Sequence, residues 1–220
     1  MVQLFKHNQL AEDVFREKYA LPNETPNQLF SRIAIEFATK ELKRFGTISV
    51  DELKGMKKFL SPQGRDYFHL LKSANKTSDF FYHYLSDFKR IVPGGSVLST
   101  LGTDKLSSLS NCFVIASPED SITGIFNTCN EQSQLMKYRG GVGFDISTLR
   151  PSKADVKNSA KTSSGSVSFT NLFSEVTNTI AQNSRRGALM LSISINHPDV
   201  EDFILVKQDL TKVTGANMSV

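Results

Sequence analysis

The stretch of residues 112–146, CFVIASPEDSITGIFNTCNEQSQLMKYRGGVGFDI, decides the fold class. It opens with a short apolar run at residues 112–115 and closes with another at residues 141–146, and both have the length of a buried strand. Between them, residues 121–138 carry apolar side chains at helical spacing, among them Ile125 and Cys129. A strand, a helix and a second strand in this order predict a βαβ unit with parallel strands.

The same alternation continues to the end of the sequence. Patterns typical of a helix, a strand, a helix and a strand follow at residues 166–181, 188–195, 198–207 and 215–220. The succession predicts an α/β fold, either a parallel sheet or a barrel with crossover helices. A parallel strand normally has both faces covered, yet the last predicted strand ends the sequence. We therefore expect an unfinished α/β domain, either because the chain is a fragment or because another polypeptide completes it.

The first 90 residues predict a helical region instead. Thr25-Pro26-Asn27-Gln28 combines an N-cap, a proline at the first helical position and a Gln three residues after the cap, which predicts a helix to about Arg44. Further helical patterns occupy residues 51–60 and 79–90, and the Pro-Gly-Gly at residues 93–95 interrupts them. The sequence thus predicts a helical domain over residues 1–92 and an α/β domain over residues 93–220.

Composition excludes several classes of protein. The net charge is only +4, and no run of Lys and Arg alternates with aromatic residues, so dedicated nucleic-acid binding is not expected. The sequence has no signal-like segment after Met1 and no apolar run near the roughly 18 residues of a membrane span. With two cysteines, it is typical of a reducing compartment, and we expect a cytoplasmic protein without a disulfide framework. No metal site is predicted.

The two cysteines lie in different sequence contexts. Cys129 falls on the apolar stripe of the predicted helix, which favours a core position. Cys112 opens a predicted strand, and parallel α/β folds place their chemistry at strand ends and in the loops that follow. A core side chain and a redox thiol both remain open for Cys112. The redox interpretation needs a second cysteine nearby, and Cys129 is a poor candidate for this partner.

Three segments are candidate anion sites, each with a structural alternative. Residues 139–143, RGGVG, either cradle a phosphate or form a helix C-cap and a tight turn. They lack the third glycine of the dinucleotide fingerprint and precede a strand, so an ordinary Rossmann enzyme is not expected. Residues 161–166, KTSSGS, either bind a phosphate at a helix start or cap that helix. Residues 183–187, NSRRG, offer two arginines to an anion or form a solvated loop.

Taken in order, these segments resemble the catalytic large subunit of ribonucleotide reductase over roughly residues 21–220. The matching blocks are ETPNQLFSRIA, PGGSVLSTLGT, LSNCFVI, EDSITGIF, KYRGGVGFDISTLRP, TSSGSVSF, RRGALM and HPDVEDFILVK. The resemblance implies a helical domain followed by the first part of a ten-stranded α/β barrel, incomplete in this chain. Because the matched helical block begins by about Leu21, no ATP-cone domain is expected ahead of it, nor the on/off control that ATP and dATP exert through that domain.

The resemblance also implies a role for Cys112. Its position matches one cysteine of a redox pair that delivers two electrons as the ribose 2′-hydroxyl leaves. The thiyl-radical cysteine, the partner of the pair and the relay cysteines of the family have no counterpart in this sequence. The chain alone is therefore not expected to turn over substrate.

Further site residues are implied position by position. The substrate-binding residues are expected to be Ser96, Ser110, Asn111, Cys112, Gly141 and Arg186, with the phosphates held largely by backbone N–H groups. The residues expected to bind a deoxynucleotide or ATP effector near a dimer interface are Asp120, Ser121, Ile122, Lys137, Arg150, Lys157 and Asn158. Residues 151–163 match the loop that contacts the effector, and residues 182–187 match the loop that relays effector identity to the substrate base.

The implied enzyme is an oxidoreductase that acts on CH or CH2 groups with a disulfide acceptor. The complete enzyme would use adenosylcobalamin or a metal-containing radical subunit, although neither is assigned to this segment. Its expected partners are the C-terminal remainder of the catalytic subunit, a second copy in a homodimer, and thioredoxin or glutaredoxin as reductant. The alternative is a non-catalytic nucleotide-binding or assembly fragment of a split reductase that needs a second chain.

Overall fold

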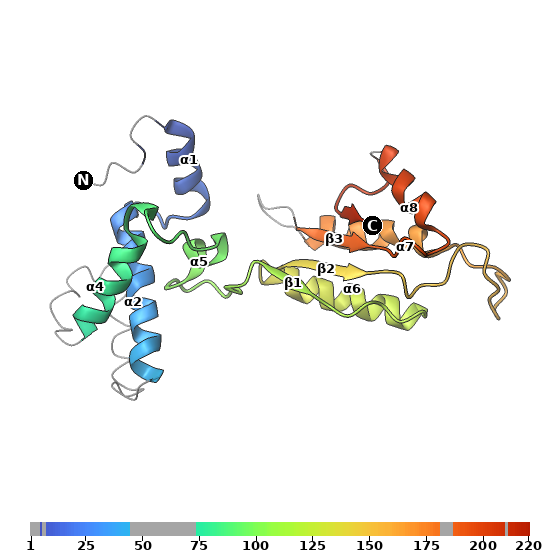
Figure 1. Ribbon diagram of the computed structural model, residues 1–220, viewed down its shortest axis with the longest axis horizontal. Helices are drawn as coiled ribbons and strands as arrows, with labels where there is room; N and C mark the ends of the chain where they lie inside the picture. The colour runs from blue at the N-terminus through green and yellow to red at the C-terminus, as the bar shows by residue number, and fades with distance from the viewer. Residues whose placement is uncertain (1–4, 6–7, 45–73, 181–186, 210) are drawn as a thin grey trace. The chain divides into compact units, whose positions relative to one another are not determined.

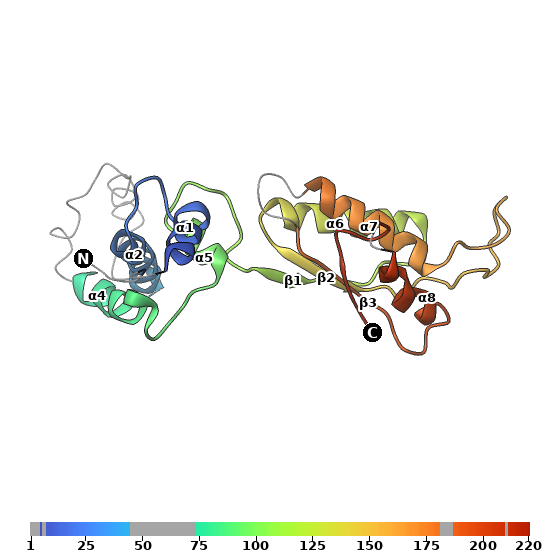
Figure 2. The same ribbon diagram turned by 90° about the horizontal axis from the view of Figure 1, so that it is seen from above.

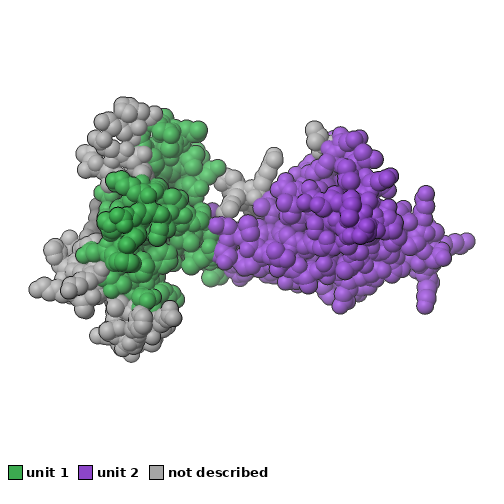
Figure 3. Space-filling view, viewed as in Figure 1, with its two compact units in different colours: residues 1–109 green, residues 110–220 purple. Residues whose placement is uncertain are grey.

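The computed structural model describes residues 5, 8–44, 74–180, 187–209 and 211–220 (Figure 1). The chain divides into two compact units, Met1–Leu109 and Ser110–Val220, which we describe separately (Figure 3). The sequence predicts the boundary between residues 92 and 93, whereas the observed division follows residue 109. The difference arises because helix α5, Gly95–Thr100, buries Leu98 in the core of the first unit.

The described part of the first unit is helical. Besides α5 it contains α1 (Gln9–Lys18), α2 (Pro26–Arg44), α4 (Ala74–Leu85) and the 3-10 turn η2 (Ser86–Phe88). Its core holds Phe15, Leu29, Phe30, Ile33, Ala34, Leu85 and Leu98. The helix predicted from residue 26 to 44 is confirmed, while the one predicted over residues 51–60 lies outside the described residues. The helix predicted over residues 79–90 starts earlier and ends at Leu85, because Asp87 and Phe88 take left-handed backbone angles.

Local hydrogen bonds explain where the first two helices begin. The Thr25 N–H donates to Gln28 Oε1 at 2.8 Å and the Gln28 N–H donates to Thr25 Oγ1 at 3.4 Å, which is the reciprocal capping predicted from the sequence. Helix α1 was not predicted as a separate element. It begins where Asn8 Oδ1 accepts the N–H of Ala11 at 3.0 Å.

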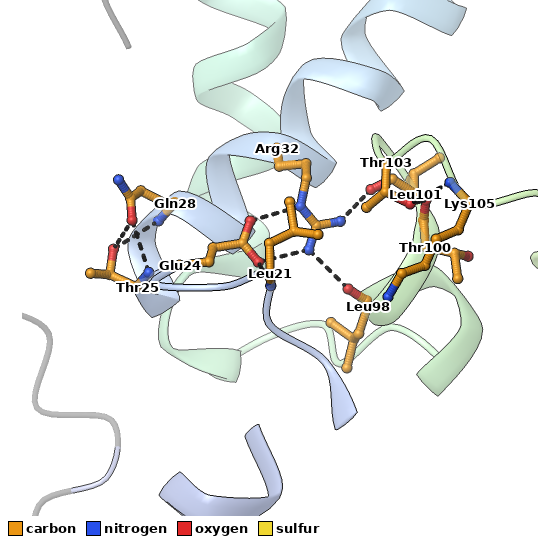
Figure 4. A network of polar contacts seen from close by, with 10 residues as sticks. All are labelled: Leu21, Glu24, Thr25, Gln28, Arg32, Leu98, Thr100, Leu101, Thr103 and Lys105. Carbon is orange, nitrogen blue, oxygen red and sulfur yellow. Dashed lines mark hydrogen bonds and ion pairs between the residues drawn. The ribbon is translucent and has the colours of Figure 1, made fainter. Parts of the chain in front are cut away.

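A buried ion pair joins Arg32 of α2 to Glu24 in the segment before this helix, and further hydrogen bonds from Arg32 reach α5 (Figure 4). Arg32 Nε donates to Glu24 Oε1 at 2.8 Å, and the two side chains are 10% and 7% exposed. Glu24 also accepts the N–H of Leu21 at 3.0 Å. The remaining guanidinium N–H groups reach the carbonyl oxygens of Leu98 and Leu101 at the end of α5. Arg32 therefore holds three chain segments together.

Among the described residues, the second unit is a four-stranded parallel sheet in the order β1-β2-β3-β4 (Figure 1). The strands are β1 (Cys112–Val114), β2 (Gly141–Asp145), β3 (Leu189–Ser192) and β4 (Asn217–Ser219). The connecting helices are α6 (Ile122–Lys137), α7 (Ser166–Ile180) and α8 (Val200–Leu205), with a 3-10 turn η3 (Val206–Gln208) after α8. All seven predicted elements form, most of them with shorter ends, and their order confirms the predicted α/β fold class.

Helices α6 and α7 cover one face of this sheet (Figure 2). On that face Phe144 of β2 packs against Phe173 of α7, with ring centres 4.8 Å apart. Val142, Leu191, and Ile125 and Cys129 of α6 belong to the same core. Along β1, β3 and β4, buried or half-buried residues alternate with exposed ones, as expected for a pleated strand with one face covered. Within the described residues, no helix is both long enough and apolar enough to cross a membrane.

Candidate functional site

Cys112 lies on the uncovered face of the sheet. It opens β1 and its side chain is exposed, as is that of Val114, which is 90% exposed two residues further along the same face. The register places Val114 beside Gly143, and Gly143 beside Met190 of β3, whose side chain is also exposed. Within the described chain Cys112 is thus not a core residue, and its thiol is accessible to a reactant.

Cys129 cannot serve as the redox partner of Cys112. It lies in α6 among the core residues on the covered face, and burial raises the pKa of its thiol. Both cysteines are free, and they are the only two in the sequence. The predicted core position of Cys129 is confirmed, and a disulfide to Cys112 would require a cysteine from outside these 220 residues.

Three predicted substrate residues lie directly around Cys112. Ser110 and Asn111 precede it, and Gly141 is its partner in the register between β1 and β2. The Gly141 N–H donates to the Asn111 carbonyl at 2.6 Å, so this N–H is used within the sheet. Of the other two, Ser96 is buried in α5 of the first unit, and Arg186 lies outside the described residues.

The glycine-rich residues after α6 form a helix C-cap. Arg139 has a left-handed backbone (φ 70°) and its N–H donates to the Met136 carbonyl, while the Gly140 N–H donates to the Leu135 carbonyl at 3.0 Å. This pair of bonds is a Schellman motif. Because the N–H groups of Arg139, Gly140, Gly141 and Val142 all donate within the chain, the phosphate-cradle interpretation of residues 139–143 is wrong.

Packing, not anion binding, explains the glycine at position 140. A Cβ there would lie 2.7 Å from two ring carbons of Phe113, whereas a Cβ at Gly143 would lie no closer than 3.6 Å to any neighbour. We expect Gly140→Ala to destabilise the second unit by about 1–3 kcal/mol through overpacking. The matched variant Gly143→Ala should change the free energy of unfolding by less than about 1 kcal/mol. Urea unfolding of both variants checks this, and equal effects would contradict the packing explanation.

Asp120 and Arg150 of the predicted effector site contact each other. Arg150 Nε donates to Asp120 Oδ2 at 2.8 Å, its backbone N–H donates to Asp120 Oδ1 at 3.2 Å, and its Nη2 donates to the Asp120 carbonyl at 3.2 Å. Both side chains remain more than a third exposed. Ser121 follows and caps α6 by accepting the Gly124 N–H at 3.0 Å, and Ile122 is exposed beside it. The structure therefore gathers four of the predicted effector residues at the start of α6.

The predicted effector loop forms an arm between β2 and α7 (Figure 1). Its two sides pair through an isolated antiparallel bridge between Asp155 and Thr162, and through the bond from the Val156 N–H to the Lys161 carbonyl at 2.8 Å. Lys157 and Asn158 lie at the turn of this arm, and both are exposed. We call residues 151–165 the effector arm.

Lys137 does not lie with the other predicted effector residues. It is the last residue of α6, and its ammonium group lies 5.5 Å from the centre of the Tyr138 ring. The rise of about 1.5 Å per helical residue puts it about 22 Å from Ile122. One chain therefore does not bring Lys137 and Asp120 onto the same nucleotide.

An aspartate that sequence reasoning missed occupies the predicted phosphate site at the start of α7. Asp199 Oδ2 accepts both the N–H and the hydroxyl of Ser166 at 2.9 Å, and Oδ1 accepts the Ser152 N–H at 2.9 Å. Burial raises the pKa of Asp199, but these hydrogen bonds outweigh it and lower the pKa below its ordinary value. The N–H of Ser166 is thus occupied by a carboxylate of the chain itself, which favours the capping alternative at this residue.

A hollow of about 760 Å³ lies in the first unit. Its lining includes Arg32, Glu36, Lys40 and Lys105. None of the predicted substrate or effector residues is among its lining residues.

Comparisons with known proteins agree with the geometry of the second unit. The family model of the ribonucleotide reductase barrel domain matches residues 110–220. The vitamin B12-dependent ribonucleoside-diphosphate reductase of Thermoplasma acidophilum is 42% identical over 147 residues, which cover 63% of this chain and 19% of that protein. The ribonucleoside-diphosphate reductase subunit alpha of Helicobacter pylori is 32% identical over 145 residues, which cover 66% of this chain and 18% of that protein.

A solved structure shares the fold. The class Id ribonucleotide reductase alpha subunit of Actinobacillus ureae superposes with a TM-score of 0.63 at 21% identity, covering 96% of this chain and 32% of that chain. Together with the barrel-domain match, this likeness confirms the predicted α/β barrel fold class. The chain spans about a fifth of the length of the curated relatives named above.

Proposed function

Because this chain belongs to the family of ribonucleotide reductase large subunits, we propose that it supplies part of the barrel and an effector site to an enzyme that reduces ribonucleotides to deoxyribonucleotides. The observation that carries the proposal is the exposed Cys112 at the start of a parallel strand inside the matched residues. The chain spans 19% of the Thermoplasma acidophilum relative, so the complete activity is assigned to an assembly larger than these residues.

In this proposal Cys112 is one half of a redox pair. Its thiol and a thiol from the remainder of the barrel become a disulfide, giving two electrons to the ribose as the 2′-hydroxyl leaves as water. The exposed position of Cys112 supports this role, and the buried Cys129 leaves the partner thiol to a residue outside these 220. Thioredoxin or glutaredoxin would then reduce the disulfide.

The substrate is proposed to be a ribonucleoside diphosphate, because the Thermoplasma acidophilum and Helicobacter pylori relatives are named for that activity. Ser110, Asn111, Gly141, Ser96 and Arg186 are proposed to bind it. The Gly141 N–H is used within the sheet, and a Cβ at this position would lie 3.2 Å from Ala188 Cβ, so the glycine also allows the close approach of residue 188. Adenosylcobalamin is proposed as the radical source on the relatives' names alone, and no residue of this chain is assigned to it.

The pair Asp120 and Arg150 is proposed to hold a deoxynucleotide or ATP effector. Arg150 would contact the phosphates of the effector, and Asp120 would contact its sugar. Ser121 and Ile122 would contact the rest of the nucleotide. Lys157 and Asn158 would approach the nucleotide from the effector arm. Because Lys137 is about 22 Å away along α6, we assign its contact to a second copy of the chain in a homodimer.

Complementation tests the proposed function. The chain is mixed with a polypeptide that carries the remaining barrel, a radical source and a dithiol reductant, and deoxyribonucleotide formation is measured. The control replaces the chain by the matching segment of the Thermoplasma acidophilum relative. Activity with the control segment but none with this chain would contradict the catalytic proposal. It would favour the alternative, a non-catalytic nucleotide-binding or assembly role, to which the single accessible cysteine also points.

For the effector site, we expect Arg150→Ala to weaken deoxynucleotide binding about tenfold or more, because a charge-assisted hydrogen bond contributes about 1.5–3 kcal/mol. Equilibrium dialysis of dTTP against the complemented complex measures the affinity. Arg16→Ala is the matched control, since it removes another guanidinium from an exposed ion pair, with Glu12 of α1. Unchanged dTTP affinity in Arg150→Ala would contradict the assignment.

A further inference from the structure

One carboxylate fixes both ends of the effector arm. Asp199 accepts the N–H of Ser152, directly after the first residue of the arm, and the N–H and hydroxyl of Ser166, directly after its last. All of these distances lie between 2.9 and 3.1 Å. Asp199 is 5% exposed, so solvent does not compete strongly for these bonds.

The backbone at the base of the arm is shaped for this carboxylate. Gly165 has a φ of +88°, a conformation that favours glycine, and a Cβ there would lie 2.8 Å from Asp199 Oδ2. The ring of the buried His197 holds the segment that carries Asp199, because Nδ1 accepts the Asp199 N–H at 3.1 Å and Nε2 bonds to the Leu149 carbonyl at 2.8 Å. The carboxylate therefore has a fixed position and close access to both ends of the arm.

The start of the arm is held from two sides. Arg150 lies two residues before Ser152, and its N–H and guanidinium donate to Asp120. Beyond Ser152 the sides of the arm are joined, since the Lys153 N–H donates to the Ser163 carbonyl and the Ser163 N–H donates to the Ala154 carbonyl. A fixed base and a paired stem determine where the exposed turn with Lys157 and Asn158 can lie.

We propose that Asp199 is the positioning residue of the effector site: by binding both ends of the arm it places Arg150 and the turn of the arm to receive one nucleotide. Asp199 does not touch the nucleotide. It lies seven residues after Ser192, the end of β3, so the strand that follows residues 182–187 leads directly to the carboxylate that holds the arm. This inference rests on the proposed effector site.

The variant Asp199→Asn tests the inference with minimal change in shape. An Asn side chain has one acceptor oxygen. With that oxygen at the Oδ2 position, the Ser152 N–H keeps only its longer bond of 3.1 Å and faces an NH₂ group in place of Oδ1; with the amide reversed, both Ser166 bonds are lost. The hold on one end of the arm is therefore weakened or lost. Asp202→Asn is the matched control, because Asp202 is an exposed carboxylate in the first turn of α8 and undergoes the same chemical change.

Two measurements are made on both variants. Hydrogen exchange of the full chain follows the amides of Lys153, Val156 and Ser163, which donate within the arm. We expect Asp199→Asn to speed their exchange about tenfold or more. In the complemented complex we expect its dTTP affinity to fall about tenfold, while turnover at saturating dTTP stays unchanged, a split that general destabilisation would not give. Asp202→Asn should behave as wild type in both measurements.

The outcomes separate the inference from the proposed function. If wild type binds dTTP and Asp199→Asn binds it equally well, the positioning role is overturned and the effector site stands. If the wild-type chain does not bind dTTP, the proposed effector site is contradicted, and so is the inference that rests on it. If Asp199→Asn does not fold, Ser166→Ala removes only the hydroxyl bond, and a loss of dTTP affinity of roughly three- to tenfold is expected, corresponding to about 0.5–1.5 kcal/mol. An unchanged affinity in that variant would overturn the positioning role.

Discussion

Replacing Cys112 with serine should reduce turnover of the complemented enzyme by roughly 10³-fold or more, because a hydroxyl cannot enter a disulfide. Serine has nearly the shape of cysteine, and the side chain is exposed, so the fold should be unaffected. Cys129→Ala is the control, since it removes the other thiol from a core position and should leave the rate per folded molecule unchanged. The measurement is deoxyribonucleotide formation with a dithiol reductant, normalised to the folded fraction.

The two-polypeptide arrangement gives this prediction a second readout. If the partner thiol belongs to the other polypeptide, one turnover without reductant should join the two polypeptides through a disulfide. A non-reducing gel would then show a covalent adduct that dithiothreitol dissolves and that Cys112→Ser never forms. Full turnover by Cys112→Ser, or an adduct that survives this substitution, would contradict the redox assignment of Cys112.

The fold of the second unit could be predicted because its signals are local. The apolar run after Cys112 and the helical stripe through Ile125 and Cys129 each report on a few neighbouring residues, and the structure places them in β1 and α6. The end of the first unit was harder to predict. The Pro-Gly-Gly at residues 93–95 is a genuine interruption, yet the boundary depends on where Leu98 packs, and that is a tertiary contact.

The site was predicted less completely, for two physical reasons. Asp199 binds Ser152 and Ser166 across 47 and 33 residues, and in the sequence it looks like the cap of its own helix, α8, although its side chain makes no cap bond there. The separation of Lys137 from Asp120 had a usable signal, since a helix over residues 121–138 already implies a distance of more than about 20 Å. The glycine pattern of residues 139–143 suggested a phosphate site, but the backbone hydrogen bonds show that these residues form a helix C-cap.

The largest loss of stability is expected in the first unit, at the buried pair of Arg32 and Glu24 (Figure 4). Arg32→Ala would leave the Glu24 carboxylate buried with only the Leu21 N–H as donor, and would remove the donors to the carbonyls of Leu98 and Leu101. Breaking one partner of such a pair costs about 3–5 kcal/mol. An exposed pair is worth about 0–1 kcal/mol, so Arg16→Ala, which breaks the exposed pair with Glu12, is the control.

Urea unfolding of the full chain, followed by helical circular dichroism, measures both variants. The double variant Arg32→Met with Glu24→Gln should be less destabilised than Arg32→Ala, because it removes the unpaired buried charge and keeps the apolar volume near α5. The difference in free energy of unfolding between these two variants separates the cost of an unpaired buried carboxylate from the loss of packing. If Arg32→Ala lowered the free energy of unfolding no more than Arg16→Ala does, the junction between α2 and α5 would depend on the apolar contacts of Leu98 and its neighbours, and not on the ion pair.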